Sequence, residues 1–135
     1  MTLIWKDGYT TGVPELDEQH RQIFAWVNEL GELIDRGIYD SPEVDALLEV
    51  MDTEFRGHFT LEEGCMSRHH CPMAQKNKQE HDQLLRTYRD FQSTFSAEKS
   101  LASFATFHVA IEGWLLEHVC FVDIHLRSCV NQLED

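Results

Sequence analysis

Histidine, carboxylate and amide side chains recur at helical spacing in this sequence. His58 and Glu62 are four residues apart, and so are Asn77 and His81. Residues four apart lie one above the other on the same face of a helix. Imidazole nitrogen and carboxylate oxygen together suit a borderline metal ion such as iron, zinc or manganese. The first prediction is therefore a metal site.

The apolar residues around these positions predict the helices that carry them. Apolar side chains recur every three or four residues in the stretches 18–36, 42–63, 73–95 and 100–118. Ser41 and Pro42 favour the start of the second stretch, and Gly64 is expected to end it. We therefore expect an all-α, antiparallel up-down four-helix bundle with an N-terminal arm and a short helical C-terminal tail.

Antiparallel packing is expected to bring the polar residues to one end of this bundle. His20 and His81 lie early in the first and third predicted helices, whereas His58, Glu62 and His118 lie late in the second and fourth. Burying so many polar groups costs several kcal/mol unless they are paired or bound to a metal. The donors outnumber the needs of one tetrahedral ion, and carboxylates bridge ions. We therefore predict a site for two metal ions.

Composition narrows the classes of partner. Lys and Arg total 11 against 24 Asp and Glu, which gives a net charge of −13. Nucleic acids and anionic membrane surfaces require a basic footprint, so we expect neither as a partner. Without a secretory signal or a run of about 18 apolar residues, a cytoplasmic protein without membrane insertion is expected. The four cysteines are then expected to be thiols: Cys65, Cys71, Cys120 and Cys129.

A set of motifs along the chain forms a recognisable pattern. They are the arm with Trp5, Asp17-Glu18-Gln19-His20, His58-Phe59-x-x-Glu62-Glu63, Glu80-His81-Asp82, and Trp114-Leu115-x-x-His118 with Asp123. Together they resemble the bacterial hemerythrins over nearly the whole chain. The resemblance implies one domain, 1–135, with a non-haem di-iron centre that binds O2 or small anions such as azide.

The resemblance also implies a role for each matching residue. Glu62 and Asp123 would bridge the two iron ions, with an oxo or hydroxo group as the third bridge. His20 and His58 would bind the iron that keeps an open position. His81 and His118 would bind the other iron.

Asn77 departs from the family pattern, which has His-x-x-x-His on the third helix. Its amide oxygen could bind weakly, solvent could fill the position, or His69 or His70 from the preceding loop could replace it. We favour solvent, because a residue seven positions upstream must reverse about two helical turns to reach the same place. A solvent-filled position at this iron would admit small anions and speed oxidation of the centre to the diferric state.

We therefore expect a sensor of oxygen, redox state or nitric oxide, and a binding domain rather than an enzyme. Bacterial hemerythrin domains are also found joined to signalling modules, so the chain is interpreted as a sensory domain with a fused or partner output domain. The alternatives are a reversible O2 carrier or storage protein, a di-iron oxidase, peroxidase or nitric oxide reductase, and a structural zinc bundle. Glu63 is expected to be solvated, and Cys65, His69, His70 and Cys71 to form a polar loop.

Overall fold

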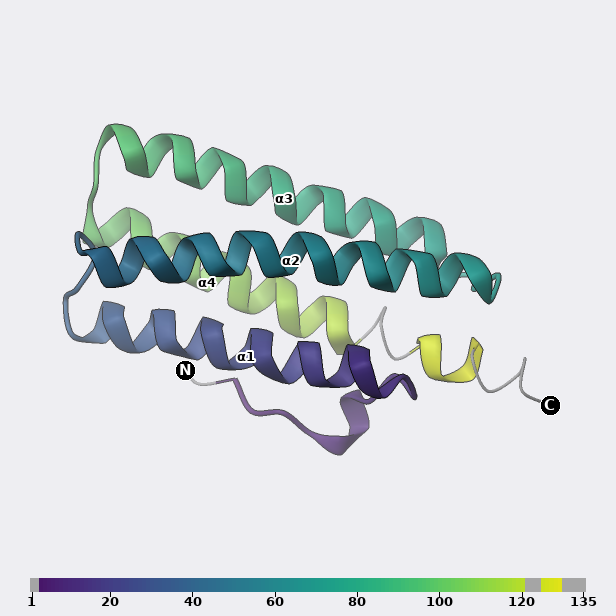
Figure 1. Ribbon diagram of the computed structural model, residues 1–135. Coiled ribbons are helices and arrows are strands. Elements are labelled where there is room, and N and C mark those ends of the chain that lie inside the picture. The colour runs from purple at the N-terminus through teal and green to yellow at the C-terminus, as the bar shows by residue number, and fades with distance from the viewer. Residues whose placement is uncertain (1–2, 121–124, 130–135) are drawn as a thin grey trace.

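A computed structural model describes residues 3–120 and 125–129 of the chain. Within this part, long helices lie side by side as α1 (Pro14–Asp35), α2 (Pro42–Arg68), α3 (Ala74–Ala97) and α4 (Leu101–His118), with the short 3-10 helix η1 (Asp7–Tyr9) in the arm (Figure 1). Helix α1 packs against α2 and α4, and α3 packs against the same two helices. The predicted all-α, up-down four-helix bundle is confirmed.

The starts of α2 and α4 follow from their capping residues. The hydroxyl oxygen of Ser41 accepts from the backbone N–H of Val44 at 3.3 Å, and that of Ser100 accepts from Ser103 at 3.0 Å. Each serine satisfies an N–H that the first turn of a helix leaves without a partner. The predicted start at Ser41-Pro42 is therefore correct.

Helix α1 begins earlier than predicted, at Pro14 rather than at residue 18. Asp17 therefore lies inside the first turns of the helix. Its carboxylate accepts from the backbone N–H of Thr11 at 2.7 Å and from the Thr11 hydroxyl at 2.9 Å. These bonds tie the arm to the start of α1.

Helix α2 continues beyond Gly64 to Arg68, so the predicted end of this helix was wrong. Cys65 and Met66 therefore belong to the helix rather than to the following loop. Both are buried, and they pack in a small apolar cluster with Leu16 and Leu126. This burial outweighs the low helix propensity of glycine.

Two separate apolar clusters fill the bundle, and a buried polar layer lies between them. Along α2 the order is Phe55 in the main cluster, Glu62 in the polar layer and Met66 in the small cluster. Along α1 the order is reversed, from Leu16 through His20. The up-down topology thus aligns the polar positions of neighbouring helices at one level.

The N-terminal arm contacts the C-terminal helical segment. The helical segment 125–129 carries Arg127, whose guanidinium donates to the backbone carbonyl oxygens of Gly8 and Thr10 in the arm. Further along the arm, Leu3 exchanges two hydrogen bonds of 2.8 Å with the side chain of Asn28 on α1. The predicted N-terminal arm therefore lies along the bundle.

A disulfide joins Cys71, in the turn after α2, to Cys129. The prediction that all four cysteines are thiols was wrong for this pair, while Cys65 and Cys120 are free. Spacing along the chain could not indicate a bond between residues 58 positions apart. Their sulfurs meet because both residues belong to the small apolar cluster.

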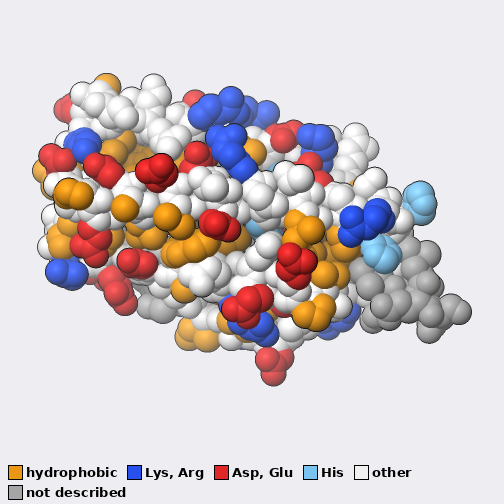
Figure 2. Space-filling view, viewed as in Figure 1, with side chains coloured by type: hydrophobic (Ala, Val, Ile, Leu, Met, Phe, Trp, Pro, Cys, Tyr) orange, Lys and Arg blue, Asp and Glu red, His pale blue; other side chains and the backbone are white. Residues whose placement is uncertain are grey.

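Two further observations describe the surface. On the face shown in Figure 2, acidic side chains are spread over the helices rather than gathered in one patch. None of the helices in the described residues is long and apolar enough to cross a membrane.

Candidate metal centre

The polar layer gathers residues from α1 to α4 around the carboxylate of Glu62. Its members are almost completely buried, with exposed fractions of 0–4%: His20, His58, Glu62, His81 and His118. The sequence predicted that early positions of α1 and α3 meet late positions of α2 and α4, and the structure brings these five residues together.

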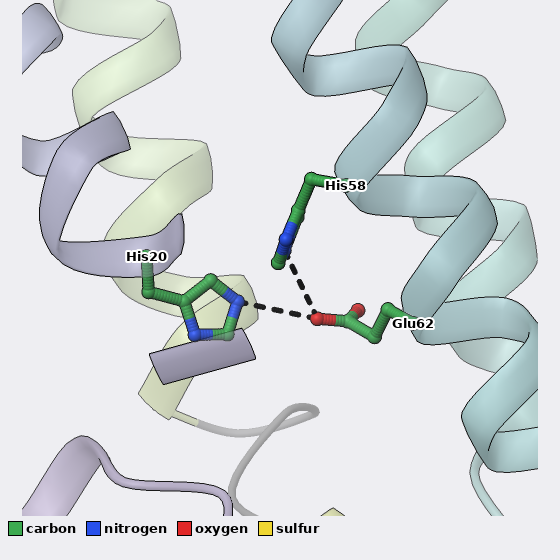
Figure 3. A group of neighbouring side chains, drawn as sticks. All are labelled: His20, His58 and Glu62. Atoms are coloured by element: carbon green, nitrogen blue, oxygen red, sulfur yellow. Dashed lines mark hydrogen bonds and ion pairs between the residues drawn. The ribbon is translucent and has the colours of Figure 1, made fainter. Parts of the chain in front are cut away.

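One oxygen of Glu62 faces the histidines of α1 and α2. Its Oε2 lies 3.2 Å from Nε2 of His20 and 3.2 Å from Nε2 of His58 (Figure 3). These three residues form one group whose donor atoms lie close enough together to hold a cation.

The other oxygen faces the histidines of α3 and α4. Oε1 of Glu62 lies 2.9 Å from Nε2 of His81 and 3.4 Å from Nε2 of His118. The two imidazole nitrogens are themselves only 3.1 Å apart. This second group of potential ligands shares Glu62 with the first, so each oxygen of one carboxylate serves one half of the centre.

A second set of polar residues orients the imidazoles from behind. Nδ1 of His58 lies 2.6 Å from Oε1 of Gln19. Nδ1 of His81 lies 3.0 Å from Oε2 of Glu63, and Nδ1 of His118 lies 3.0 Å from Oε1 of Glu80. Such partners fix the proton on Nδ1 and aim the Nε2 lone pair at the metal position.

The bracing residues follow a simple rule along the chain. Gln19 precedes His20 but braces His58 on α2, and Glu63 follows Glu62 but braces a histidine on α3. Glu80 precedes His81 and braces a histidine on α4. Glu63 was expected to be solvated; its side chain is 29% exposed, but its carboxylate also accepts from His81. The available signal was a polar residue directly beside His20, Glu62 and His81.

This arrangement fits a pair of cations. With Nδ1 of three imidazoles facing Gln19, Glu63 and Glu80, their Nε2 atoms converge on one carboxylate. Lone pairs 3.1 Å apart repel each other unless a proton or a cation lies between them. Nitrogen donors on both sides of a carboxylate that offers one oxygen to each are the donor set for two borderline metal ions.

The charge of Glu62 follows from these contacts. Burial alone would raise the pKa of its carboxyl group, but the interactions with His118, His20, His58 and His81 outweigh burial and hold the pKa well below its ordinary value. Glu62 is thus an anion inside the bundle, which suits a group that bridges two cations.

Aromatic rings close the centre on the side of α3 and α4. The ring of Phe59 stacks on His81 with centroids 3.9 Å apart, and the indole of Trp114 stacks on His118 at 4.5 Å. Phe55 stacks in turn on Phe59. These rings shield that side of the centre from water.

Asn77 lies one turn before His81 on the same face of α3 and is completely buried. Neither its amide oxygen nor its amide nitrogen has a hydrogen-bond partner among the described residues. A buried amide without partners costs about 1–3 kcal/mol, so a group from outside the protein is expected to contact it. The buried amide of Asn77 therefore indicates a bound ion or solvent molecule in this layer.

The remaining predicted residues lie elsewhere. His70 is exposed and takes a positive φ of 52° in the turn after α2. Neither His69 nor His70 joins the two groups of potential ligands in the described part of the chain. Asp123, the second predicted bridge, lies outside the described residues.

Comparison with known proteins agrees with this geometry. Residues 11–126 match the family model of the hemerythrin HHE cation binding domain. The bacteriohemerythrin of Methylococcus capsulatus is 28% identical over 123 residues, which cover 91% of this chain and 92% of the relative. That of Clostridium acetobutylicum is 26% identical over 127 residues, with 86% and 92% covered. That of Stenotrophomonas maltophilia is 23% identical over 117 residues, with 87% and 74% covered.

The family match spans most of the chain, and it includes every residue of the buried polar layer. The layer itself holds the His and Glu groups that a cation-binding domain requires. The chain therefore belongs to the hemerythrin family, whose domains bind non-haem iron and oxygen.

Proposed function

We propose that this chain is a di-iron domain that senses oxygen or redox state and oxidises readily in air. The observation that carries the proposal is the buried amide of Asn77, which stands one helical turn before His81 and lacks a partner among the described residues. A resting oxygen carrier needs a second metal position that is closed to exogenous ligands. An amide is a poorer donor than an imidazole and leaves that position open to solvent.

The ligands proposed for the two ions follow the two halves of the layer. His20 and His58 hold one ion, and His81 and His118 hold the other. Glu62 bridges them, because each of its oxygens faces one pair of imidazoles. Asp123 is proposed as the second bridge on the strength of the family pattern, together with an oxo or hydroxo group.

Two iron ions held here would supply the binding and reduction of O2. The protein contributes the arrangement around them. Gln19, Glu63 and Glu80 keep the protons of three imidazoles on Nδ1, so Nε2 remains a donor. Phe59 and Trp114 keep water away from His81 and His118.

The experiment compares the native protein with Asn77→His, after both are loaded with iron to the same measured content. The diferrous proteins are mixed with air-saturated buffer in a stopped-flow spectrometer, and the rise of the near-ultraviolet diferric bands is followed. We expect Asn77→His to oxidise about tenfold more slowly, a difference of ~1.4 kcal/mol in activation free energy. Azide is expected to bind the diferric native protein more readily than the variant.

The outcomes separate the proposed function from its alternatives. Slow oxidation of the native protein, with reversible O2 binding over many cycles, would identify a carrier or storage protein instead. Rapid turnover of peroxide or nitric oxide that is lost in Asn77→His would identify an enzyme. A protein purified with zinc alone, without visible bands after iron loading, would exclude a di-iron function.

Two broader proposals accompany the sensing role. We propose that the single domain, 1–135, is coupled to a fused or partner signalling domain. We also propose a cytoplasmic location, although disulfides are rare in reducing compartments. Alkylation of thiols in intact cells tests the location: four alkylated cysteines indicate a reducing compartment, whereas two, Cys65 and Cys120, contradict it.

A further inference from the structure

We propose that the two halves of the centre stabilise ions of different charge, because two carboxylates brace the imidazoles of one half and a neutral amide braces an imidazole of the other. The half formed by His81 and His118 stabilises the more highly charged ion. This inference rests on the proposed di-iron site. It assigns to Glu63 and Glu80 a positioning role that acts through the histidines they contact.

The contacts behind the imidazoles carry the inference. Glu63 and Glu80 each accept from the Nδ1–H of a histidine at 3.0 Å, whereas the corresponding acceptor of His58 is the amide oxygen of Gln19 at 2.6 Å. Thus all three bonds have similar geometry, but only those on the α3 and α4 side end in a negative charge. The difference between the halves is therefore one of charge rather than of orientation.

Burial makes these charges effective. The side chains of Glu63 and Glu80 are only 29% and 21% exposed, and the imidazoles they brace are buried. A charge acts more strongly through a partly desolvated path than through water. A carboxylate that accepts from Nδ1–H also makes the imidazole a stronger donor at Nε2. Both effects favour a higher positive charge beside His81 and His118.

Other charges near these residues are more exposed. Lys78 Nζ lies 3.9 Å from the second oxygen of Glu63, and Lys76 Nζ lies 4.0 Å from that of Glu80. Both lysine side chains are more than 60% exposed, so solvent screens them. On the other half, Glu54 lines a small cavity with Gln19 and His58, but it is exposed as well. Among the described residues, the partly buried carboxylates of Glu63 and Glu80 therefore dominate the difference.

The bracing carboxylates also explain how the half that contains Asn77 retains its ion. An amide in place of an imidazole weakens the donor set on the α3 and α4 side. Two negative charges behind the remaining imidazoles strengthen it. When an external one-electron reductant delivers one electron to the diferric centre, we expect the ion beside His20 and His58 to become ferrous first.

The first test uses Zn²⁺ as a redox-inert probe. The metal-free protein is titrated with Zn²⁺ by calorimetry, for the native chain, Glu63→Gln, Glu80→Gln and the matched control Gln19→Glu. Glutamine still accepts from Nδ1–H, so these variants remove charge and keep the hydrogen bond. Glu63→Gln and Glu80→Gln are each expected to weaken one of two Zn²⁺ ions by about 10–100-fold. Gln19→Glu is expected to strengthen binding of the other ion.

The second test measures the two one-electron reduction potentials of the iron-loaded proteins with dithionite and mediators. In Glu63→Gln and Glu80→Gln the lower potential should rise, and in Gln19→Glu the higher one should fall. The difference between the two reduction potentials should therefore narrow in all three variants by ~59 mV. This corresponds to about tenfold in the equilibrium constant for electron transfer between the two ions. A general loss of structure cannot strengthen Zn²⁺ binding in Gln19→Glu.

An unchanged or wider difference between the two potentials, or equal weakening of both Zn²⁺ ions, would overturn this inference. Neither result depends on the rate of oxidation in air. A protein that oxidises slowly would thus contradict the sensing function while leaving the charge difference intact. A protein that oxidises rapidly but binds two equivalent Zn²⁺ ions would support the sensing function and contradict the charge difference.

Discussion

The same four helices form both ends of the bundle, but the two ends bury different kinds of side chain. At the end far from the metal centre, the rings of Phe91 and Phe107 stack with centroids 3.8 Å apart, and Phe95 and Phe104 extend the stack. At the other end, a polar layer separates the main apolar cluster from the small one. The aromatic end gains stability by excluding polar groups, whereas the metal end gives up apolar burial to hold donors.

This contrast shows where the folding free energy and the function are located. A dry aromatic core stabilises the bundle whether or not metal is bound. The polar layer contributes stability only when its donors are satisfied. Changes at the first end should therefore alter unfolding without altering metal stoichiometry, and changes at the second should depend on metal.

The largest effect is expected at the aromatic end. Phe104 is fully buried, so Phe104→Ala removes apolar burial and leaves a cavity. We expect a loss of about 3–5 kcal/mol in the free energy of unfolding, measured by urea denaturation. The protein that remains folded should still bind two metal ions.

A matched control for this variant is Ile4→Ala, because Ile4 is 66% exposed. It should change the free energy of unfolding by less than about 0.5 kcal/mol. If Phe104→Ala instead kept its stability and lost metal, the division between the two ends would be wrong.

A smaller effect is expected from the disulfide at the metal end. The double variant Cys71→Ser, Cys129→Ser frees the unfolded chain from a crosslink, which we expect to cost about 2–4 kcal/mol. Hydrogen exchange should show faster opening of residues 125–129, while the turn between α3 and α4 stays protected. The single variant Cys120→Ser serves as the control, since this cysteine is free. An equal loss of hydrogen-exchange protection at both ends of the bundle would contradict a disulfide effect that is confined to the metal end.

The smallest effect is expected from a substitution that makes one position of the polar layer apolar. Asn77→Leu replaces a buried amide without partners by an apolar side chain of similar size. We expect the metal-free protein to gain about 1–3 kcal/mol, seen as a higher midpoint of thermal unfolding after chelator treatment. With metal bound, the gain should shrink or disappear. An unchanged midpoint in the metal-free protein would mean that the amide is already satisfied.

The bundle and its polar layer could be predicted because both depend on helical periodicity. His58 and Glu62 continue an apolar stripe in register, and such residues are buried wherever the helix packs. His108 follows the same rule as a histidine of the core. It lies on the stripe of α4 and is buried, and its Nε2 donates to the backbone carbonyl of Val27 at 3.0 Å. Gly31 permits this approach, since a Cβ there would lie 3.0 Å from the same nitrogen.

Contacts between side chains of different helices could not be predicted in the same way. Whether Glu63 reaches His81 or solvent depends on the rotation of α2 against α3, which periodicity leaves open. The disulfide likewise depends on where residues 125–129 lie after α4. The extension of α2 past Gly64 depends on the burial of Cys65 and Met66 by residues distant in sequence. In each case, tertiary packing decided what local pattern left undetermined.

The tryptophans described above give each half of the centre its own optical reporter. The indole of Trp114 stacks on His118 at 4.5 Å, and that of Trp5 lies 6.1 Å from the ring of His20. Paramagnetic ions quench indole fluorescence at such short range. Trp26 is the third tryptophan of the chain, so it would first be replaced by phenylalanine. In that background, the emission of Trp114 and of Trp5, separated by replacing either with phenylalanine, would record the filling of the two positions independently.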